Sequence, residues 1–447
     1  MPGLPVASGV LRDSQFMRAL PVRPEPLWLI DFHQRITVSL WFLPTIFAAA
    51  AIGAANLTIW LDTRIAAPIG VRPDLVSDPG TAATFAGAIA AATLAFVAVV
   101  FATTLVAIQL AASQYSPRTV RIFIRSRITR VTLGLFLATF VFSLIILVSN
   151  RASVGSAKQF APVVSVSVLL ALTLATVFGF VVYLHTVVRL MRVQYLIEAI
   201  ASESRRAIEE NFPPASAYLD VEFAQLDSSP RRLDYAGTAG VVSATDFHGL
   251  VTLCQRKKCW LELTVGAGEY LVHGTPIALV HGSALDGREV SKFFLMRGER
   301  TFVQDPAFGF RQLVDIAIRA LSPAVNDPTT AVQAIDRISD LLAIMGTRPD
   351  PTGLRVDSEG AVRVKQKLRN FDGLLVLALT EIIRYGAGAP QVVRRLLHVL
   401  NELEGTLPTE RHAVIARHRR LLDAAVAIAL PAPFAAVASV PDREGLG

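Results

Sequence analysis

Polar side chains inside a long apolar run are the first candidates for chemistry in this chain. No residue between Asp78 and Arg118 carries a formal charge. The run nevertheless contains hydroxyl and amide groups that could line a pore: Thr103, Thr104, Gln109, Ser113 and Gln114. Within hydrocarbon such groups need a hydrogen-bond partner or water. They therefore either bond to neighbouring helices or line a polar pathway, and both interpretations stay open.

Arginines follow this run at helical spacing. Arg118, Arg121 and Arg125 are three and four residues apart, so a helix would place them on one face. One interpretation is contact with anionic lipid headgroups. The other is a basic collar at a pore mouth or an anion site.

A second group of polar residues lies in the stretch 322–330, which reads Ser-Pro-Ala-Val-Asn-Asp-Pro-Thr-Thr. Asp followed by Pro is typical of a helix start, with Asp as N-cap and Pro in the first turn. Helix N-termini also bind anions. We therefore also consider a ligand site formed by Asn326, Asp327, Thr329 and Thr330.

The remaining polar residues form no recognisable catalytic motif. The sequence contains no phosphate-binding loop, no dinucleotide-binding glycine pattern and no HExxH zinc motif. Cys254 and Cys259 have no matching Cys or His cluster beside them, so we expect reduced, inert thiols. His412 and His418 are expected to be exposed on a basic helix. We therefore expect no enzyme activity, no cofactor and no metal.

Composition places these residues in a membrane protein. Hydrophobic residues make up 52% of the chain and charged residues only 18%, with a mean hydropathy of +0.48. These values are too apolar for an ordinary soluble protein. The net charge of +7 is concentrated beside the apolar segments, which favours lipid headgroups over nucleic acid as its partner.

Four segments are long and apolar enough to cross a bilayer. They are Ile36–Trp60, Thr81–Ala112, Val131–Ser149 and Pro162–Val188. Lys and Arg are more frequent in the N-terminal arm, in 113–130 and after the fourth segment than in the two other loops. The positive-inside rule then predicts a multi-pass protein of the bacterial inner membrane with both termini in the cytoplasm.

Small residues in the first two segments allow close helix packing. Gly87, Ala91 and Ala95 repeat every four residues. The repeat serves either packing within one bundle or contact between copies. Four helices leave little room for a pore within one chain, so we expect a homo-oligomer.

The soluble half begins with an amphipathic stretch. Residues 189–211 are expected to continue the fourth membrane helix, and a linker runs to 235. Residues 236–303 change to short strands at Gly240–Ala244, Leu250–Leu253, Trp260–Val265 and Pro276–Val280. Gly266 and Gly268 mark a tight turn. The run 265–280 resembles a lipoyl-like barrel or sandwich but contains no lysine for an attached group.

Helices return from about 304. Asp305-Pro306 and Asp327-Pro328 are predicted helix starts. A short hairpin is expected at 354–364, followed by helices over Phe371–Tyr385, Pro390–Glu404 and Thr409–Leu430. The expected organisation is a cytoplasmic arm (1–35), a membrane domain (36–188), a helix and linker (189–235), a β-domain (236–303), a helical domain (304–430) and a disordered tail (431–447).

Three stretches together resemble a known family. Leu105–Arg118, Asp305–Leu321 and Ser322–Ala331 are similar to an uncharacterised bacterial family of predicted membrane proteins, domain of unknown function 2254. The resemblance covers about residues 27–425. It implies an inner-membrane protein and no particular activity, cofactor or substrate.

These observations predict an α-helical membrane protein with four transmembrane helices and a cytoplasmic α+β region. The leading functional hypothesis is an oligomeric ion channel with a cytoplasmic regulatory domain. The alternative is a non-conducting sensor or scaffold that binds a small ligand, an ion or a partner.

Overall fold

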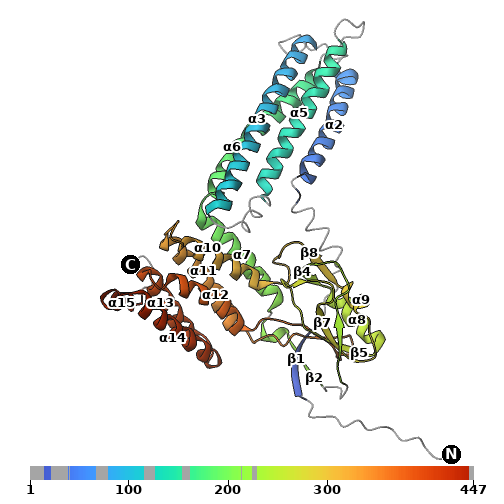
Figure 1. Ribbon diagram of the computed structural model, residues 1–447. Coiled ribbons are helices and arrows are strands. Elements are labelled where there is room, and N and C mark those ends of the chain that lie inside the picture. Colours follow the sequence, from blue (N-terminus) through green and yellow to red (C-terminus); the bar gives the residue numbers. More distant parts are fainter. Residues whose placement is uncertain are drawn as a thin grey trace, which may run out of the picture. The chain divides into compact units, whose positions relative to one another are not determined.

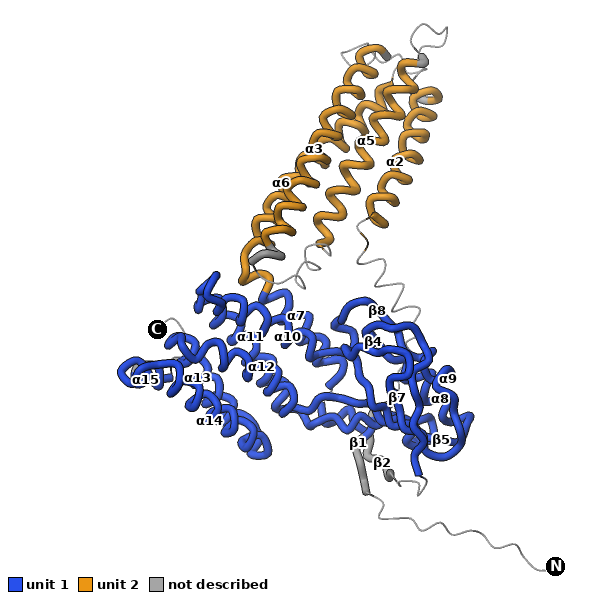
Figure 2. The backbone as a smooth tube through the Cα atoms, in the orientation of Figure 1, with its two compact units in different colours: residues 1–33, 197–447 blue, residues 34–196 orange. Residues whose placement is uncertain are grey.

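The computed structural model describes residues 15–21, 39, 41–66, 79–114, 126–153, 162–212, 214–223 and 229–441. Two compact units divide the chain (Figure 2). The membrane unit comprises residues 34–196, and the soluble unit combines residues 1–33 with 197–447.

Among the described residues of the membrane unit there are four long helices (Figure 1). They are α2 (Phe42–Leu61), which continues into a π-helical turn (Asp62–Ala66), α3 (Pro79–Gln114), α5 (Arg127–Ser153) and α6 (Val163–Leu190). Each contains a window apolar and long enough to cross a membrane. The four predicted spans are therefore confirmed. With 36 residues, α3 is about 54 Å long and exceeds a bilayer core of about 30 Å.

The central helix of this unit is α5. It packs against α2, α3 and α6, and 44% of its apolar window is buried, against 22% or less in the other three helices. Its Phe136 meets Phe96 and Phe180 at ring-centroid distances of 6.0 and 6.2 Å. Aromatic packing of this kind fixes helix positions in lipid, where no hydrophobic force drives helices together.

A buried carboxylate joins two of the membrane helices. Asp62, at the end of α2, is fully buried. Its oxygens accept the backbone N–H groups of Val164 (2.7 Å) and Ser165 (3.0 Å) at the start of α6. Asp62 therefore caps a helix on another chain segment, and the negative charge faces the positive end of that helix.

The strands of the soluble unit form two open sheets. The larger has the order β2-β1-β9-β10-β5-β7-β3 and the smaller β6-β4-β8. Their bounds are β1 Gln15–Pro21, β2 Leu219–Phe223, β3 Arg231–Asp234, β4 Gly240–Thr245, β5 Cys259–Leu263, β6 Tyr270–Leu271, β7 Pro276–Gly282, β8 Phe294–Arg297, β9 Leu354–Val356 and β10 Val362–Lys365. The strands do not close into a barrel, so the predicted barrel resemblance is not confirmed.

Strand β1 brings the N-terminal arm into this sheet. It pairs antiparallel with β2, with Gln15 opposite Phe223, and parallel with β9, with Ala19 opposite Leu354. Strands that share a ladder must lie in the same compartment. An even number of membrane spans must therefore separate β1 from β2, in agreement with the four long helices between them.

One predicted strand is wrong. Leu250–Leu253 belongs to helix α8 (Phe247–Lys257), whose N-cap Asp246 accepts the N–H of Gly249 at 2.8 Å. Leu250, Leu253 and Cys254 are buried at the spacing of one helical face. The apolar run was too short to distinguish a strand from such a helix.

The C-terminal part of the soluble unit is helical, as predicted. Its helices are α10 (Pro306–Ala320), α11 (Pro328–Gly346), α12 (Phe371–Gly386), α13 (Pro390–Thr406), α14 (His412–Ala429) and α15 (Ala432–Ala438). Helix α9 (Gly287–Ser291) lies earlier, between β7 and β8. The predicted hairpin is confirmed as β9 and β10. Helix α15 forms within a tail that we predicted to be disordered.

Two further expectations differ from the structure. A turn at Met191 and Arg192 separates α6 from α7 (Val193–Asn211), so the expected continuous helix is interrupted. His418 is buried rather than exposed, and its Nδ1 lies 2.9 Å from the carbonyl oxygen of Val414. Burial lowers the pKa of His418 below its usual range.

Candidate functional site

The predicted pore residues Thr103 and Thr104 point into the helix bundle. Their hydroxyl oxygens lie 3.0 and 2.6 Å from the hydroxyl of Tyr183 on α6. Tyr183 is fully buried and donates to the carbonyl of Val100 at 3.0 Å. This geometry fits the interpretation in which polar groups bond to neighbouring helices.

The other membrane candidates have different positions. Gln109 is exposed on the surface of α3. Ser113 and Gln114 belong to the last turn of α3, but the structure does not describe their side chains. Arg118, Arg121 and Arg125 lie outside the described residues. Their predicted roles stay predictions.

The predicted ligand loop starts helix α11. Both Asp327 oxygens are engaged by Thr330, one by its N–H at 3.1 Å and the other by its hydroxyl at 2.6 Å. Asn326 adopts a left-handed conformation with φ of 49°, and Asn326 and Thr329 are exposed. The polar groups of Asp327 and Thr330 are thus used in capping, and the ligand site proposed here stays a prediction.

A cavity elsewhere in the soluble unit gathers more charged groups. It has a volume of about 280 Å³, close to the lower limit of about 300 Å³ for small-molecule sites. It lies where β4, β5 and β10 end and where α8, α10 and α12 begin.

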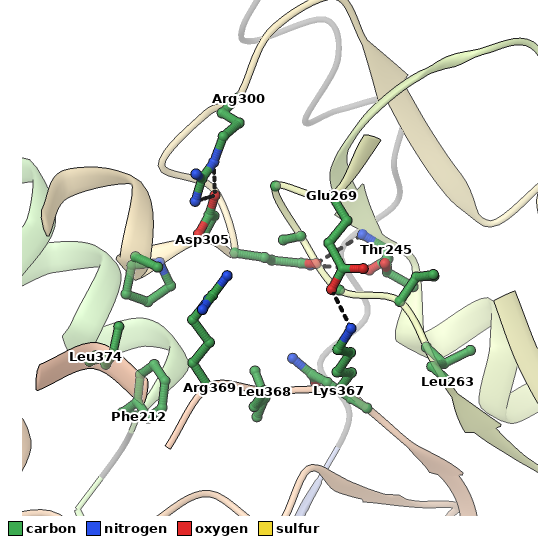
Figure 3. Close-up of a pocket in the computed structure, with 18 of the residues that line it drawn as sticks. Phe212, Thr245, Leu263, Glu269, Arg300, Asp305, Lys367, Leu368, Arg369 and Leu374 are labelled. Atoms are coloured by element: carbon green, nitrogen blue, oxygen red, sulfur yellow. Dashed lines mark hydrogen bonds and ion pairs between the residues drawn. The ribbon is translucent and has the colours of Figure 1, made fainter. Parts of the chain in front are cut away.

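The most buried polar group of the cavity is the carboxylate of Asp305 (Figure 3). Its Oδ2 accepts hydrogen bonds from Nε of Arg300 at 2.8 Å and from Nη2 of Arg300 at 2.7 Å. Burial raises the pKa of Asp305, and the nearby Arg300 and Arg369 oppose this shift. Asp305 precedes α10 as predicted, but its side chain pairs with Arg300 instead of capping the helix.

A glycine turn forms one wall of the cavity. Gly268 has a φ of +86°, and a Cβ placed there would lie 2.3 Å from Oδ2 of Asp305. A Cβ on Gly266 would lie 2.9 Å from the carbonyl oxygen of Lys367. The glycines that predicted a tight turn also let this turn approach the Asp305 carboxylate and the Lys367 backbone, which follows β10.

A second ion pair joins this wall to the opposite one. Nζ of Lys367 lies 2.8 Å from Oε1 of Glu269 (Figure 3), and the side chains are 50% and 37% exposed. Arg369 is also exposed and points toward the Asp305 carboxylate. Exposed pairs of this kind contribute little to stability, about 0–1 kcal/mol, so this pair is free to open.

Hydrogen bonds hold the uncharged polar residues of the cavity lining in place. The side-chain amide of Gln304 accepts the N–H of Thr245 at 2.8 Å and donates to the Thr245 carbonyl at 3.1 Å. Gln366 accepts from Nη2 of Arg355 at 2.9 Å. The Arg355 guanidinium lies 5.0 Å from the ring centroid of Phe247, and burial lowers the pKa of Arg355 to about 10.

The cavity lining combines charged and apolar side chains. Among its lining residues three are cationic and two are acidic, and none is Ser, Cys or His. Apolar residues form another part of the lining: Phe212, Phe247, Leu263, Val265, Pro306, Ala307, Leu368 and Leu374. No cluster of three metal-ligating side chains occurs within the part of the chain that the structure describes.

Sequence reasoning missed most of this site. It singled out Asp305 as a helix start and Gly266 and Gly268 as a turn, but not Glu269, Arg300, Lys367 or Arg369 as a group. The parallel pairing of β10 with β5, with Val364 opposite Leu261, brings 366–369 to the turn. No local signal in the sequence reports that pairing.

Comparison with known proteins assigns the chain to a family. Residues 37–402 match the family model described as "Predicted membrane protein (DUF2254)". The chain belongs to this family. The resemblance stated from the sequence motifs is thereby confirmed.

Relatives occur in mycobacteria. The uncharacterized proteins Rv1290c of Mycobacterium tuberculosis and Mb1321c of Mycobacterium bovis are each 26% identical over 400 residues, which covers 86% of this chain and 75% of each relative. No solved structure matches the chain.

Proposed function

We propose that this family member is a membrane-anchored sensor whose soluble unit binds a small ligand in the cavity beside Asp305. The main support is the convergence of charged side chains at the ends of three strands and the starts of three helices. The Arg300–Asp305 pair holds two of these groups in place before any ligand enters. Preorganised polar groups of this kind give small-molecule sites their specificity.

The proposal places the soluble unit in the cytoplasm and the four helices in the inner membrane. The distribution of Lys and Arg favours this orientation. The pairing of β1 with β2 and β9 supports placing the N-terminal arm and residues 197–447 on the same side. The ligand would then be a cytoplasmic metabolite. The proposal includes membrane lipids and further copies of the chain as partners, and no catalytic step.

The test is a ligand screen on the full-length protein in lipid nanodiscs. Cys254 and Cys259 are the only cysteines of the chain and are both buried in the soluble unit. The rate of thiol labelling therefore reports opening of that unit alone. A metabolite that binds the cavity should slow labelling in proportion to its occupancy.

A matched pair of variants connects the result to the cavity. Ala267→Leu adds bulk to the lining turn, whereas Ala413→Leu adds the same bulk to an exposed position of α14. We expect protection to disappear only in Ala267→Leu. Protection that survives in Ala267→Leu, or a broad screen without any protecting metabolite, would contradict the proposal.

A second candidate function is an oligomeric pore. Its support is the exposed side of α3, where small residues accompany Gln109: Ala88, Ala91, Ala95, Ala98 and Ala102. Such a face permits close contact between copies. Ion flux from liposomes tests it, with Gln109→Leu expected to change conductance. An absence of flux from a folded oligomer under varied voltage, tension and pH would count against a pore.

A further inference from the structure

The charges around the cavity do not balance. Asp305 pairs with Arg300, and Glu269 pairs with Lys367. Arg369 is the third cation of the lining and points toward the carboxylate that Arg300 already occupies (Figure 3). The cavity therefore carries a net positive charge when both acids are ionised.

A cation behind the lining adds to this positive potential. Arg355 donates to Gln366 and lies against Phe247, two residues of the cavity wall. A cation beside a cavity wall attracts negative charge, so Arg355 favours a negatively charged occupant.

Another part of the lining excludes a purely ionic occupant. Phe247, Ala267 and Leu368 are half-buried and contribute apolar surface to the cavity. A free inorganic ion would leave this surface wetted by water. A ligand with an apolar body would cover it and gain from the removal of that water.

We propose that the cavity binds a small organic anion, with its charged group at Arg369 and its apolar body against Phe247 and Leu368. This inference rests on the proposed sensor function and specifies its ligand class. The exposed Lys367–Glu269 pair forms the rim, and its opening lets Lys367 contribute to the same anion. A carboxylate and a phosphate monoester share this chemistry, and planar guanidinium groups recognise both.

The test is calorimetric titration of the full-length protein in nanodiscs. The probes are aliphatic and aromatic carboxylates of increasing size, each with its neutral carboxamide, together with the matching phosphate monoesters and inorganic phosphate. We expect at least one organic anion to bind tenfold or more tightly than its neutral or inorganic counterpart. The preferred series then distinguishes a carboxylate from a phosphate ligand.

Two arginine variants provide the matched control. Arg369→Gln removes an exposed cation of the lining, and Arg384→Gln removes an exposed cation of α12 outside it. We expect tenfold weaker anion binding in Arg369→Gln, unchanged binding in Arg384→Gln, and unchanged thiol labelling of the ligand-free proteins in both. Glu269→Gln releases Lys367 and should strengthen anion binding two- to fivefold.

The outcomes separate the ligand class from the sensor function. Equal binding of acids and their amides, or unchanged anion binding in Arg369→Gln, would overturn the anion assignment. If neutral probes bind and Ala267→Leu abolishes their binding, the sensor proposal survives and only the ligand class is wrong. If no probe of any charge binds and the wider screen also fails, both proposals are overturned.

Discussion

Polar side chains have different surroundings in the membrane unit and in the soluble unit. In the membrane unit some are paired across helices: the hydroxyls of Thr139 and Thr176 are 2.7 Å apart, and Thr103 and Thr104 share Tyr183. Other hydroxyls bond to a carbonyl of their own helix, as Thr93 does to Ile89. In the soluble unit, charged side chains from distant segments converge on one cavity, where part of their surface stays open to solvent.

Polar residues therefore differ in how strongly they indicate a functional site in the membrane unit and in the soluble unit. A hydroxyl in a lipid-facing helix has no water to bond to, so it bonds to a carbonyl of its own helix or to a neighbouring helix. In the cavity, charged groups form ion pairs, and Lys367 and Glu269 also keep contact with solvent. Polar residues in α3 are therefore weak evidence for a pathway, whereas the cluster around Asp305 is stronger evidence for a ligand.

The largest expected effect concerns Asp62. Asp62→Ala leaves two backbone N–H groups of α6 without their carboxylate acceptor. Hydrogen bonds to charged groups contribute about 1.5–3 kcal/mol each, so we expect the membrane unit to lose about 3 kcal/mol or more. Unfolding by SDS in mixed micelles, followed by far-UV circular dichroism, measures the loss.

The control for this change is Thr63→Ala, the neighbouring exposed residue of the same turn. It should alter stability by less than about 0.5 kcal/mol, as is usual for surface positions. If Asp62→Ala is as mild as the control, the view that the membrane unit depends on pairing across helices is wrong.

The next largest effect concerns the turn at Gly268. Gly268→Ala combines a positive φ with a Cβ placed 2.3 Å from the Asp305 carboxylate. We expect about 2–3 kcal/mol of destabilisation in the soluble unit, from backbone strain and overpacking. Faster thiol labelling of Cys254 and Cys259 measures it.

A variant at Gly274 separates backbone strain from overpacking. Its φ is +84°, but no atom lies within 4 Å of a Cβ placed there. Gly274→Ala should cost about 1 kcal/mol from strain alone. Equal labelling rates for the two variants would show that the cavity wall has room to move and is not preorganised.

A smaller effect is expected for Tyr183→Phe. The change removes the hydroxyl that Thr103 and Thr104 share, but both threonines keep their bonds to the carbonyl of Val100. We expect a loss of about 1 kcal/mol in the membrane unit. SDS unfolding measures it, with the exposed Tyr195→Phe as the control. A loss as large as that of Asp62→Ala would mean that the shared hydroxyl organises the whole bundle.

The smallest effect is a pH-dependent one in the soluble unit. Both guanidinium ends of Arg311 donate to Glu381, at 2.5 and 2.9 Å, and this bonding holds the pKa of Glu381 below its usual 4.5. As the pH is lowered, the Glu381 carboxylate is therefore protonated in the unfolded chain before it is protonated in the folded chain. The stabilisation is complete above pH 4.5 and is lost as the pH falls through the lowered pKa.

Glu381→Gln should cost about 1 kcal/mol at pH 7, because both side chains retain solvent contact. The loss of stability caused by Glu381→Gln should fall toward zero at acidic pH. Thiol-labelling rates measured across the pH range test this. The exposed Glu410→Gln is the control. A cost that is constant with pH would assign the effect to packing rather than to charge.

Sequence reasoning succeeded where the signal was local. The four spans follow from length and hydropathy within each segment, and the starts of α10 and α11 follow from Asp-Pro pairs. The Asp-Pro dipeptide predicts a helix start but not the partner of the Asp305 side chain. Whether this side chain caps the helix or pairs with Arg300 depends on its burial in the folded chain. Tyr183 is likewise unremarkable in sequence and gains its role only when α6 packs near Thr103.

The site failed to emerge from the sequence because its walls come from separate segments. Glu269 and Lys367 are joined only after β10 has aligned with β5. The pairing of β1 with β9 is equally non-local, and nothing in the N-terminal arm distinguishes that strand from an extended linker.

The position of β1 has a consequence for how the protein is made. Translation produces this strand before any membrane helix, yet its neighbours β2 and β9 follow the last one. The strand must stay unpaired beside the membrane while the helices insert, and it completes the sheet only after Leu354 has left the ribosome. A fragment restricted to residues 197–447 would lack an interior strand and expose two bare sheet edges, which promote aggregation.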